Sequence, residues 1–454
     1  MRVSALLILT GLVFSVSAQA QTESGLIEAF AGWLETSAFE VKGSSLNDPD
    51  YDLQPIGKMV GDARIVGLSE SLHSADEPVV FRNRLFKYLV EEHGFKAIVI
   101  ESGVPESKAL NDYAFGTEHD LESSLLEGLS NRFDMFQGNR SLLQWIRDHN
   151  DSLPVGQQKV QIFGMDVSGS PPGIIATRKP DAPLRDVLDY LDGVDADSAK
   201  EFRQRIESLL PVLASGNDYG ALPQLQRDTL TATIEDVISL IQRRKPEYVT
   251  ASTEYNYLWA ERTAIAARQT DSWFRSMPLE WTPSGDYKWT EKSQNIRDRT
   301  MVDNLDWVLS QLNQTDRVFV FASVNHIAAE QHEYPYYLID QGQRQQTLTP
   351  FGYYAKDRYG EEFVNILNMV GSGEIKMCFR PDSASIPMEA PRADWIEAMF
   401  HEHYLDEYFI DLRVAPERVS NWLSERRDQR NARISALGSF DIAYYVKEFT
   451  HDCF

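Results

Sequence analysis

The sequence contains only two cysteines among its 454 residues, Cys378 and Cys453. This number excludes a scaffold built on several disulfides and a metal site built from cysteine alone, since a structural zinc needs about four ligands. A single bridge between the two is possible if the chain is exported. Basic residues are fewer than acidic ones: the chain has 44 Lys and Arg and 68 Asp and Glu, which gives a formal net charge of −24. Nucleic acid and anionic membranes require basic patches, so neither is an expected partner.

Long apolar runs are missing after the first 20 residues, so we expect no membrane insertion of the mature chain. Residues 1–20 begin with the basic Arg2, continue with an apolar stretch from Val3 to Val16, and end in the small-residue sequence Ser-Ala-Gln-Ala. This order is typical of a secretory signal peptide cleaved after Ala20. We therefore predict an exported protein, periplasmic or secreted, whose mature form is residues 21–454.

Several catalytic motifs are missing as well. The sequence has no G-x-S-x-G nucleophile elbow, no H-E-x-x-H zinc motif, no Walker A sequence and no strand-linked G-x-G-x-x-G fingerprint. No cofactor is predicted. What remains is chemistry by histidine and carboxylate groups that activate water, together with arginine that meets an anion or a developing oxyanion.

The apolar pattern predicts an α/β fold with a largely parallel central sheet flanked by helices. Residues 63–70 form a predicted strand, a helix with Pro78 in its first turn ends at Gly94, and residues 96–101 form the next strand. Strand, helix and strand in this order indicate a right-handed parallel crossover. Further short apolar runs predict buried strands at 160–166, 318–322, 363–369, 409–412 and 442–446.

Strand signals disappear between about residues 184 and 312. Helical patterns replace them at 199–213, 222–243, 254–275 and 292–312. We interpret this region as a helical insertion or cap on one α/β domain comprising residues 21–454. The last of its helices is expected to lead back into the sheet.

Polar residues follow several of the predicted strands. In open parallel sheets, ligands bind beyond the carboxyl ends of the strands, so these residues are candidates for a site. Each also has a structural interpretation, such as a solvated loop histidine, a buried paired histidine or a carboxylate that caps a helix or loop. The candidates are Glu70 and His73, Glu101, Asp166, and then Ser323, Asn325 and His326.

Arg297 lies on a helical face shared with Met301, Leu305 and Val308. This face otherwise packs inward, and a buried guanidinium requires a carboxylate or substrate partner. The partner is a substrate anion, Asp298 or a carboxylate of the sheet. A metal pair at His401 and His403 is not favoured, because histidines two apart on a helix point in different directions.

Several of these segments resemble motifs of the erythromycin esterase family. GLSESLH at 67–73 is similar to the family's G-E-x-T-H-G loop, IRDRTMVDNLDWVL at 296–309 to its R-D-x-x-M-x-x-N helix, and FASVNHIA at 321–328 to its W-A-H-N-x-H-V-A strand end. The similarity spans essentially the whole mature chain. It implies an ester hydrolase in which His73 acts as base for water, Glu101 and Glu70 support it, and His326 and Arg297 complete the site.

The sequence departs from the family pattern at four positions. Ser323 stands where the family has the first histidine of H-N-x-H, and Val324 where it has asparagine. Ser74 replaces the glycine after the loop histidine, and Leu72 replaces the threonine before it. The region from about 184 to 290 matches least, and a cap in such enzymes would shape substrate choice.

Three functions follow as hypotheses. The leading one is a metal-independent hydrolase of a small-molecule ester or lactone. The second uses a divalent metal held by His73, Glu101, Glu70 and His326. The third is a small-molecule-binding protein that lost catalysis with the histidine at position 323. The residues expected to contact the small molecule are Ser323, Asn325, Asp166 and Ser74.

Overall fold

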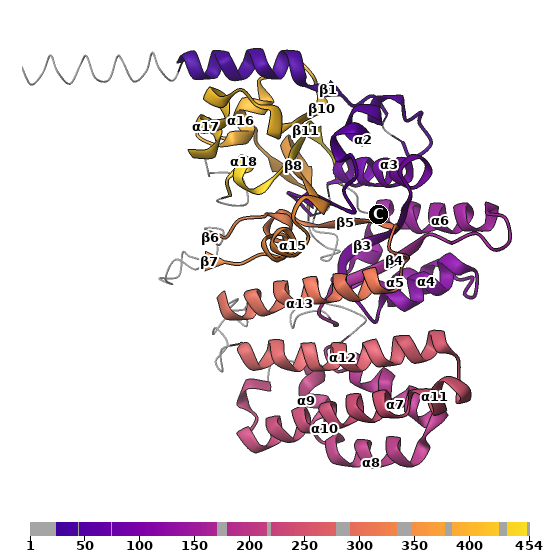
Figure 1. Ribbon diagram of the computed structural model, residues 1–454. Helices are drawn as coiled ribbons and strands as arrows, with labels where there is room; N and C mark the ends of the chain where they lie inside the picture. Colours follow the sequence, from indigo (N-terminus) through magenta and orange to yellow (C-terminus); the bar gives the residue numbers. More distant parts are fainter. Residues whose placement is uncertain are drawn as a thin grey trace, which may run out of the picture.

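The computed structural model describes residues 24–43, 45–73, 75–169, 179–215, 219–277, 291–333, 347–376, 384–425 and 434–451. The predicted signal peptide, Ser74, Cys378 and Cys453 lie outside these described residues. The described part has an α/β body and, below it in Figure 1, a group of stacked helices. None of the helices in the described ranges combines the length and the apolar character needed to cross a membrane.

The body is built around a sheet of nine strands within the described ranges. The strands are β1 (Phe39–Glu40), β2 (Ile65–Glu70), β3 (Phe95–Gly103), β4 (Gln161–Asp166), β5 (Arg317–Ser323), β8 (Phe363–Ile375), β9 (Ile386–Met388), β10 (Glu407–Asp411) and β11 (Ile442–Phe449). Their order is β1-β10-β11-β8-β2-β5-β3-β4, with β9 beside β8. Neighbours from β11 to β4 run parallel, whereas β1, β9 and β10 pair antiparallel. The predicted fold class, a largely parallel sheet flanked by helices, is confirmed.

Alternating side chains of the strands fill two separate cores, one on each face of the sheet. In β5, Val318 and Val320 enter one core, and Phe319 and Phe321 enter the other. The second core is covered by α2 (Gln54–Val60), α3 (Asp76–His93), α4 (Ser107–Phe115), α5 (Leu121–Gly128) and α6 (Gln137–Ser152). The first is covered by residues 24–37, α13 (Glu291–Ser310), α14 (Val324–Ile327), α15 (Phe351–Tyr359), α16 (Ile396–His401), α17 (Glu417–Glu425) and α18 (Ala436–Ser439).

The crossover from β2 to β3 follows the sequence pattern. Pro78 lies in the first turn of α3, and Gly94 ends this helix in the left-handed conformation, with φ 72°. The two strands are not adjacent, because β5 lies between them. Segments about 250 residues apart in the chain thus meet at the centre of the sheet. A small antiparallel pair, β6 (His332–Glu333) and β7 (Thr347–Leu348), lies outside the main sheet.

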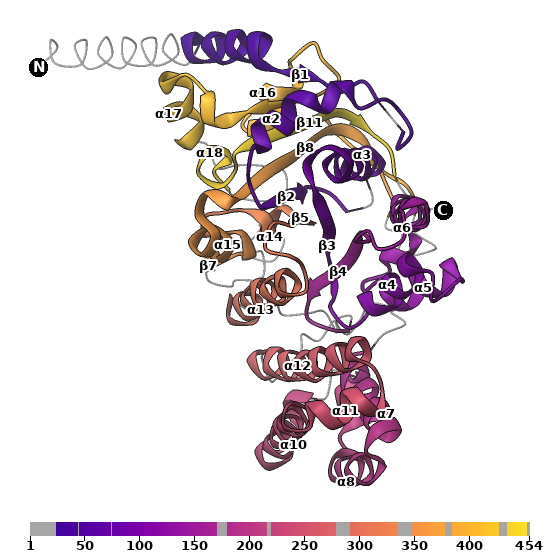
Figure 2. The ribbon, with the colours of Figure 1, turned by 45° about the vertical axis from the view of Figure 1, so that its right-hand side comes forward.

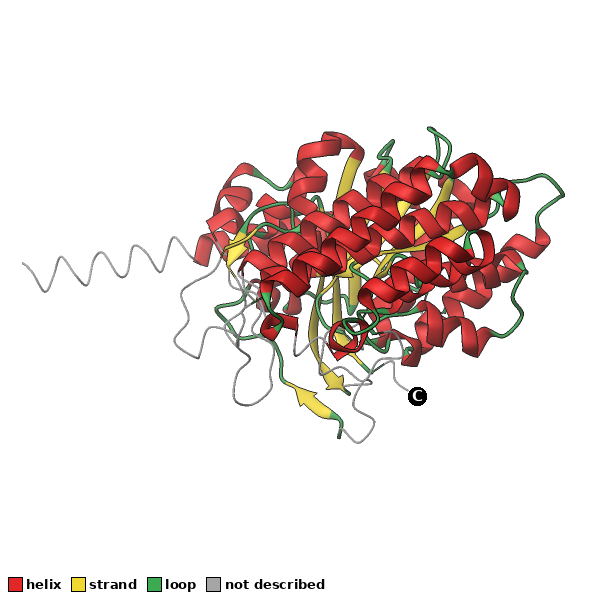
Figure 3. Cartoon of the chain, turned by 90° about the horizontal axis from the view of Figure 1, so that it is seen from below, coloured by secondary structure: helices red, strands yellow, loops and turns green. Residues whose placement is uncertain are grey.

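The stacked helices below the sheet have a hydrophobic core of their own, and Figure 2 shows these helices as a separate group under the body. They are α7 (Ala182–Val194), α8 (Ala196–Ile206), α9 (Leu210–Ser215), α10 (Gln224–Arg243), α11 (Lys245–Ala251) and α12 (Glu254–Ser276). Viewed from below, the helices lie across the strands (Figure 3). Buried side chains of α13, by contrast, join the core of the sheet. Of the region predicted as a cap, the last helix therefore packs with the body.

The predicted helix 199–213 is divided into α8 and α9. Pro211 explains the break, because proline has no N–H for a helical hydrogen bond and is tolerated only in a first turn. The chain therefore ends one helix at Ile206 and begins another at Leu210.

Candidate active site

The register of the parallel strands places the predicted carboxylates at one edge of the sheet. Glu70 ends β2 opposite Ser323 at the end of β5, and Asp166 ends β4 opposite Gly103 of β3. Glu101 lies two residues before this last pairing. Glu70, Glu101 and Asp166 are 5%, 7% and 4% exposed. Carboxylates buried this far require cationic or hydrogen-bonding partners.

The strand β3 is irregular where it carries Glu101. Its register with β4 shifts between Ile100 and Gly103, and such bulges redirect side chains near functional sites. The neighbouring strand fits closely against this irregularity because it has glycine there. A Cβ at Gly164 would lie 2.3 Å from the carbonyl oxygens of Ser102 and Gly103.

Arg297 of α13 is the centre of the buried charges. Its Nε donates to Asp166 Oδ1 at 2.9 Å, and its Nη2 donates to Asp166 Oδ2 at 2.5 Å and to Glu101 Oε1 at 2.8 Å. The guanidinium thus binds the carboxylates of two strands, with a bidentate contact to one of them. Of the alternatives left open by the sequence, the structure shows sheet carboxylates, Asp166 and Glu101, as hydrogen-bond partners of Arg297.

Asp298 instead binds His326, which lies in α14. The Asp298 Oδ1 atom is 2.7 Å from His326 Nδ1 and also accepts a hydrogen bond from the Phe351 backbone N–H at 2.8 Å. The other ring nitrogen, Nε2, lies 3.0 Å from Arg297 Nη1 and 3.4 Å from Glu101 Oε1. His326 is therefore held by charged groups on both sides of its ring.

The contacts of His326 limit where its ring protons can lie. Burial lowers the pKa of His326, but the carboxylates of Asp298 and Glu101 outweigh burial and raise it to about 10. A protonated ring would, however, point Nε2–H at the Arg297 guanidinium 3.0 Å away. If Nε2 accepts from Arg297, the ring is neutral and Nδ1–H donates to Asp298; if the ring is protonated, Nε2–H has Glu101 Oε1 at 3.4 Å as its acceptor. His326 can take up a proton only by giving up the Arg297 contact.

His73 differs from His326 in exposure and in number of partners. Its Nδ1 lies 2.5 Å from Glu70 Oε2, and its side chain is 43% exposed. Burial lowers the pKa of His73, but the charge of Glu70 and the hydrogen bond to it raise the pKa to about 9. The ring lies beside Phe133, with 5.7 Å between ring centroids and 47° between the ring planes. The exposed part of the imidazole is accessible to solvent and to a substrate.

A small pocket lies beside Glu70 and Glu101. Its walls are mainly apolar, from Phe133, Phe136, Phe321, Val79 and Ile100, and they also contain Arg82 and Asn139. Arg82 is 2% exposed, and its guanidinium donates to Asn139 Oδ1 at 2.9 Å and lies 4.7 Å from the Phe321 ring centre. Sequence reasoning missed this residue. The available signal was its position three residues after Val79 and three before Leu85, on the buried face of α3.

The loop that carries Phe133 has an unusual backbone. Asn131 and Arg132 have φ angles of 59° and 65°, in the left-handed region. Asparagine tolerates this conformation, but for arginine it is unfavourable by about 1–2 kcal/mol. The two residues precede the short 3-10 helix Phe133–Met135, where the ring of Phe133 contacts His73. The strained backbone at Arg132 thus lies directly before Phe133, which forms part of the pocket wall.

Ser323, Asn325 and Ser74 are the other residues predicted to contact substrate, and the structure describes the first two. Ser323 donates its backbone N–H to Glu101 Oε2 at 2.8 Å. Asn325 is half-buried, and its Oδ1 has no hydrogen-bond partner among the described residues. Ser74 lies outside the described residues. The structure thus brings Glu70, Glu101, Asp166, Arg297 and His326 together, with His73 at the exposed side.

No group of three or more His, Cys, Asp and Glu side chains in the described ranges is arranged to hold a metal ion. Within the cluster, the Arg297 guanidinium binds carboxylate oxygens that a cation would need. His401 lies away from this cluster and contacts the Tyr445 hydroxyl, with 2.8 Å from Nδ1 to the oxygen.

Comparisons with known proteins agree with this architecture. Erythromycin esterase type II of Escherichia coli is 25% identical over 138 residues, which are 30% of this chain and 32% of that protein. Erythromycin esterase type I of Escherichia coli is 26% identical over 201 residues, 43% and 44% of the two chains. The matches thus span less than half the length of these curated relatives.

Solved structures match over nearly the whole chain. A Bacillus cereus protein has a TM-score of 0.73 at 21% identity, with 94% of this chain and 98% of that chain covered. A histidine-to-asparagine variant of the erythromycin esterase EreC in its open conformation has a TM-score of 0.65 at 19% identity, with 89% and 95% covered. These likenesses support the fold. The family model for erythromycin esterase matches residues 90–447, and the chain therefore belongs to the erythromycin esterase family.

Proposed function

We propose that the protein hydrolyses a carboxylic ester or lactone, with His73 as the base that activates water. One observation carries this proposal. A partly exposed imidazole is held at 2.5 Å by the buried Glu70, at the side of a cluster whose other charges bind one another. A histidine fixed by a carboxylate through one nitrogen presents the other nitrogen for proton transfer.

The proposed reaction requires no covalent enzyme intermediate. Neutral His73 takes a proton from water, and the water oxygen forms a bond to the carbonyl carbon of the substrate. The carbonyl π electrons move to oxygen, giving a tetrahedral oxyanion. The bond from carbon to the alcohol oxygen then breaks, and the imidazolium returns the proton to the leaving alkoxide. The products are a carboxylic acid and an alcohol, or one hydroxy acid from a lactone.

We propose different roles for Arg297 and Arg82. Arg297 binds Asp166, Glu101 and His326 at the same time, so it acts by fixing these groups in place. Arg82 lines the pocket beside Glu70 and Glu101. A guanidinium in a site of low water content stabilises developing negative charge strongly, and Arg82 is the one we propose for the oxyanion.

The substrate class follows from the relatives and from the site. The two curated relatives are erythromycin esterases, so macrolide lactones are the first candidates. Position 323 carries serine where the family motif has histidine, and this replacement removes one imidazole beside Glu101. We propose that the preferred ester differs from that of erythromycin esterases, and that the cap of α7–α12 contributes to this choice.

Export is a further part of the proposal. The basic start, the apolar stretch and the small residues at 17–20 support cleavage after Ala20. Expression of the full chain followed by amino-terminal sequencing of the exported protein tests it. A mature terminus at Gln21 is expected, and retention of residues 1–20 would contradict export by this route.

The activity is tested with residues 21–454 and a panel of nitrophenyl esters, simple lactones and erythromycin. Hydrolysis of at least one compound is expected, with kcat/KM reduced at least about a hundredfold in His73→Ala. His119→Ala, at an exposed position, is the matched control and should be unaffected. Unchanged turnover in His73→Ala would refute the role of His73, and no turnover of any compound would favour a binding protein. Inhibition by a chelator would favour the metal-dependent alternative.

A further inference from the structure

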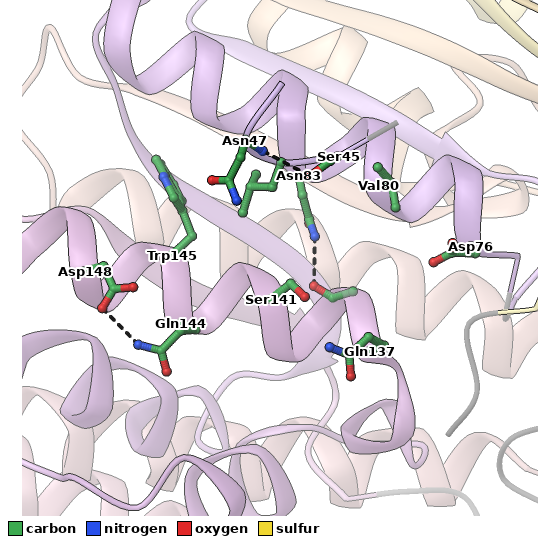
Figure 4. A pocket seen from close by; sticks show the side chains of 12 residues that line it. Ser45, Asn47, Asp76, Val80, Asn83, Gln137, Ser141, Gln144, Trp145 and Asp148 are labelled. Carbon is green, nitrogen blue, oxygen red and sulfur yellow. Dashed lines mark hydrogen bonds between the residues drawn. The ribbon is translucent and has the colours of Figure 1, made fainter. Parts of the chain in front are cut away.

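A second, larger pocket lies on the body between α3 and α6. The segment 45–47 crosses one side of it, and Figure 4 shows side chains from all three segments around the space. Its volume is about 480 Å³, within the range that holds small molecules. Neither the proposed hydrolysis nor the sequence motifs account for it.

Most of the polar groups in this pocket are neutral amides and hydroxyls. They belong to Ser45, Asn47, Asn83, Gln137, Ser141 and Gln144. Asn83 donates to the Gly138 carbonyl at 2.8 Å and Gln144 donates to Asp148 Oδ1 at 2.9 Å, so these two are fixed by the protein. The side chains of Asn47 and Gln137 are exposed and make no hydrogen bond to described residues. An amide offers both donors and acceptors, which suits a ligand with several hydroxyl groups.

The charges around the pocket exclude anionic ligands. Asp76 and Asp148 line it, and the residues that line it include no lysine or arginine. Phosphate, nucleotides and acidic lipids would meet repulsion from these carboxylates, and the lining offers them no lysine or arginine. A neutral or amino-bearing ligand fits this charge pattern.

Trp145 adds an aromatic surface. Its indole is half-buried and meets the Phe86 ring edge to face, with 5.8 Å between centroids and 81° between planes. The His149 ring lies on another side of it, with 5.3 Å between centroids. These contacts fix the ring, and Figure 4 shows the indole at the pocket beside Asn47. A pyranose ring has a face of C–H groups that stacks on an indole and a rim of hydroxyls that bond to amides.

We propose that the pocket between α3 and α6 binds a carbohydrate that carries no negative charge. It lies next to the candidate active site, because Arg82 and Asn139, which line the smaller pocket, adjoin Asn83 and Gly138 in the chain. If the proposed hydrolysis holds, the substrate is a glycosylated or sugar-borne ester, and this part rests on that function. Binding of a carbohydrate in this pocket does not depend on the proposed hydrolysis.

The test measures binding by residues 21–454 directly. The probes are methyl glucoside, methyl galactoside, methyl mannoside, glucosamine and a maltotriose chain, with glucuronate as the anionic comparison. Titration calorimetry and ligand-detected NMR should show saturable binding of at least one neutral or amino sugar. Trp145→Ala should weaken it at least tenfold and Gln137→Ala at least threefold, whereas Trp145→Phe should retain most of the affinity.

Two control variants lie outside the pocket. Trp422→Ala removes another half-buried indole, and Gln226→Ala removes another exposed amide; neither should change the affinity. If Trp145→Ala lacks a folded circular dichroism spectrum, Gln137→Ala at its exposed position decides the test. The proposal is overturned by absence of saturable binding, by equal losses in Trp145→Ala and Trp422→Ala, or by tighter binding of glucuronate than of methyl glucoside. A protein that binds sugars but hydrolyses no ester would refute the proposed function alone.

Discussion

The site has a buried half around Arg297 and His326 and an open half formed by His73 and Glu70. In the buried half, Arg297 and His326 each contact three other titratable side chains. In the open half, one imidazole has one carboxylate partner and a side chain that is 43% exposed. Both histidines have a carboxylate at Nδ1, but only His73 has an exposed side chain and no second charged partner at hydrogen-bond distance among the described residues.

This difference separates two tasks that a hydrolytic site must perform. A proton acceptor must change its charge in each cycle, and a group held through both nitrogens cannot do so without breaking a contact. His73 can exchange a proton with water while it keeps its bond to Glu70. We infer that the buried half fixes the geometry and that the open half carries out the chemistry.

The largest expected effect comes from removing the centre of the buried half. Arg297→Ala leaves Asp166 and Glu101 as buried carboxylates without their cation. Removal of one member of a buried ion pair is destabilising by about 3–5 kcal/mol. Denaturant unfolding followed by circular dichroism should show this loss.

Arg299→Ala on the same helix is the matched control, since the Arg299 side chain is 51% exposed. It should change the free energy of unfolding by less than about 0.5 kcal/mol. Adding Asp166→Asn to Arg297→Ala should recover part of the stability, because it removes one uncompensated charge. Equal stability of the two arginine variants would contradict the distinction between the halves.

A smaller effect is expected at Asp298, which orients His326 without facing the open half. Asp298→Asn keeps the size of the side chain but removes the strong acceptor for Nδ1–H. The ring can then turn or change its tautomer, and misplacement by about 1 Å is enough for a hundredfold loss in kcat/KM. Nitrogen NMR shifts of the His326 ring should change at the same time.

Asp303→Asn is the control for this variant, because Asp303 lies on the same helix with its side chain 48% exposed. It should leave both kcat/KM and the histidine shifts unchanged. Full activity of Asp298→Asn would mean that the orientation of His326 is not required, and the buried half would then serve stability alone.

The sequence predicted which carboxylates lie at the sheet edge better than it predicted their contacts. Glu70, Glu101 and Asp166 were found because each follows a short apolar run, and strand ends share an edge in a parallel sheet. The contacts among them depend on the strand order, with β5 between β2 and β3. Local patterns do not contain this order, so the choice of Asp166 and Glu101 as partners of Arg297 could not be predicted.

Arg82 and the loop before Phe133 show the same limit. A single arginine on the apolar face of α3 is one signal among many, and its meaning depends on which helix packs beside it. The positive φ angles at Asn131 and Arg132 are not a property that arginine favours. Such a conformation is imposed by tertiary contacts, so propensity alone argues against it.

The pH dependence of hydrolysis tests the role of the open half most directly. The charge of Glu70 raises the pKa of His73 to about 9. A base must be deprotonated to accept a proton, so kcat/KM of the wild type should rise as pH increases towards this value. Glu70→Gln removes the negative charge and lowers the pKa of His73 towards its ordinary value of about 6.5. The acidic limb should therefore move down by at least about one pH unit, by less than the full difference because water screens the exposed ring.

Glu127→Gln, at an exposed carboxylate, should leave the limb in place. At pH 6 the variant is then expected to retain a larger fraction of its own maximal rate than the wild type, and an unmoved limb would show that His73 is not the titrating base.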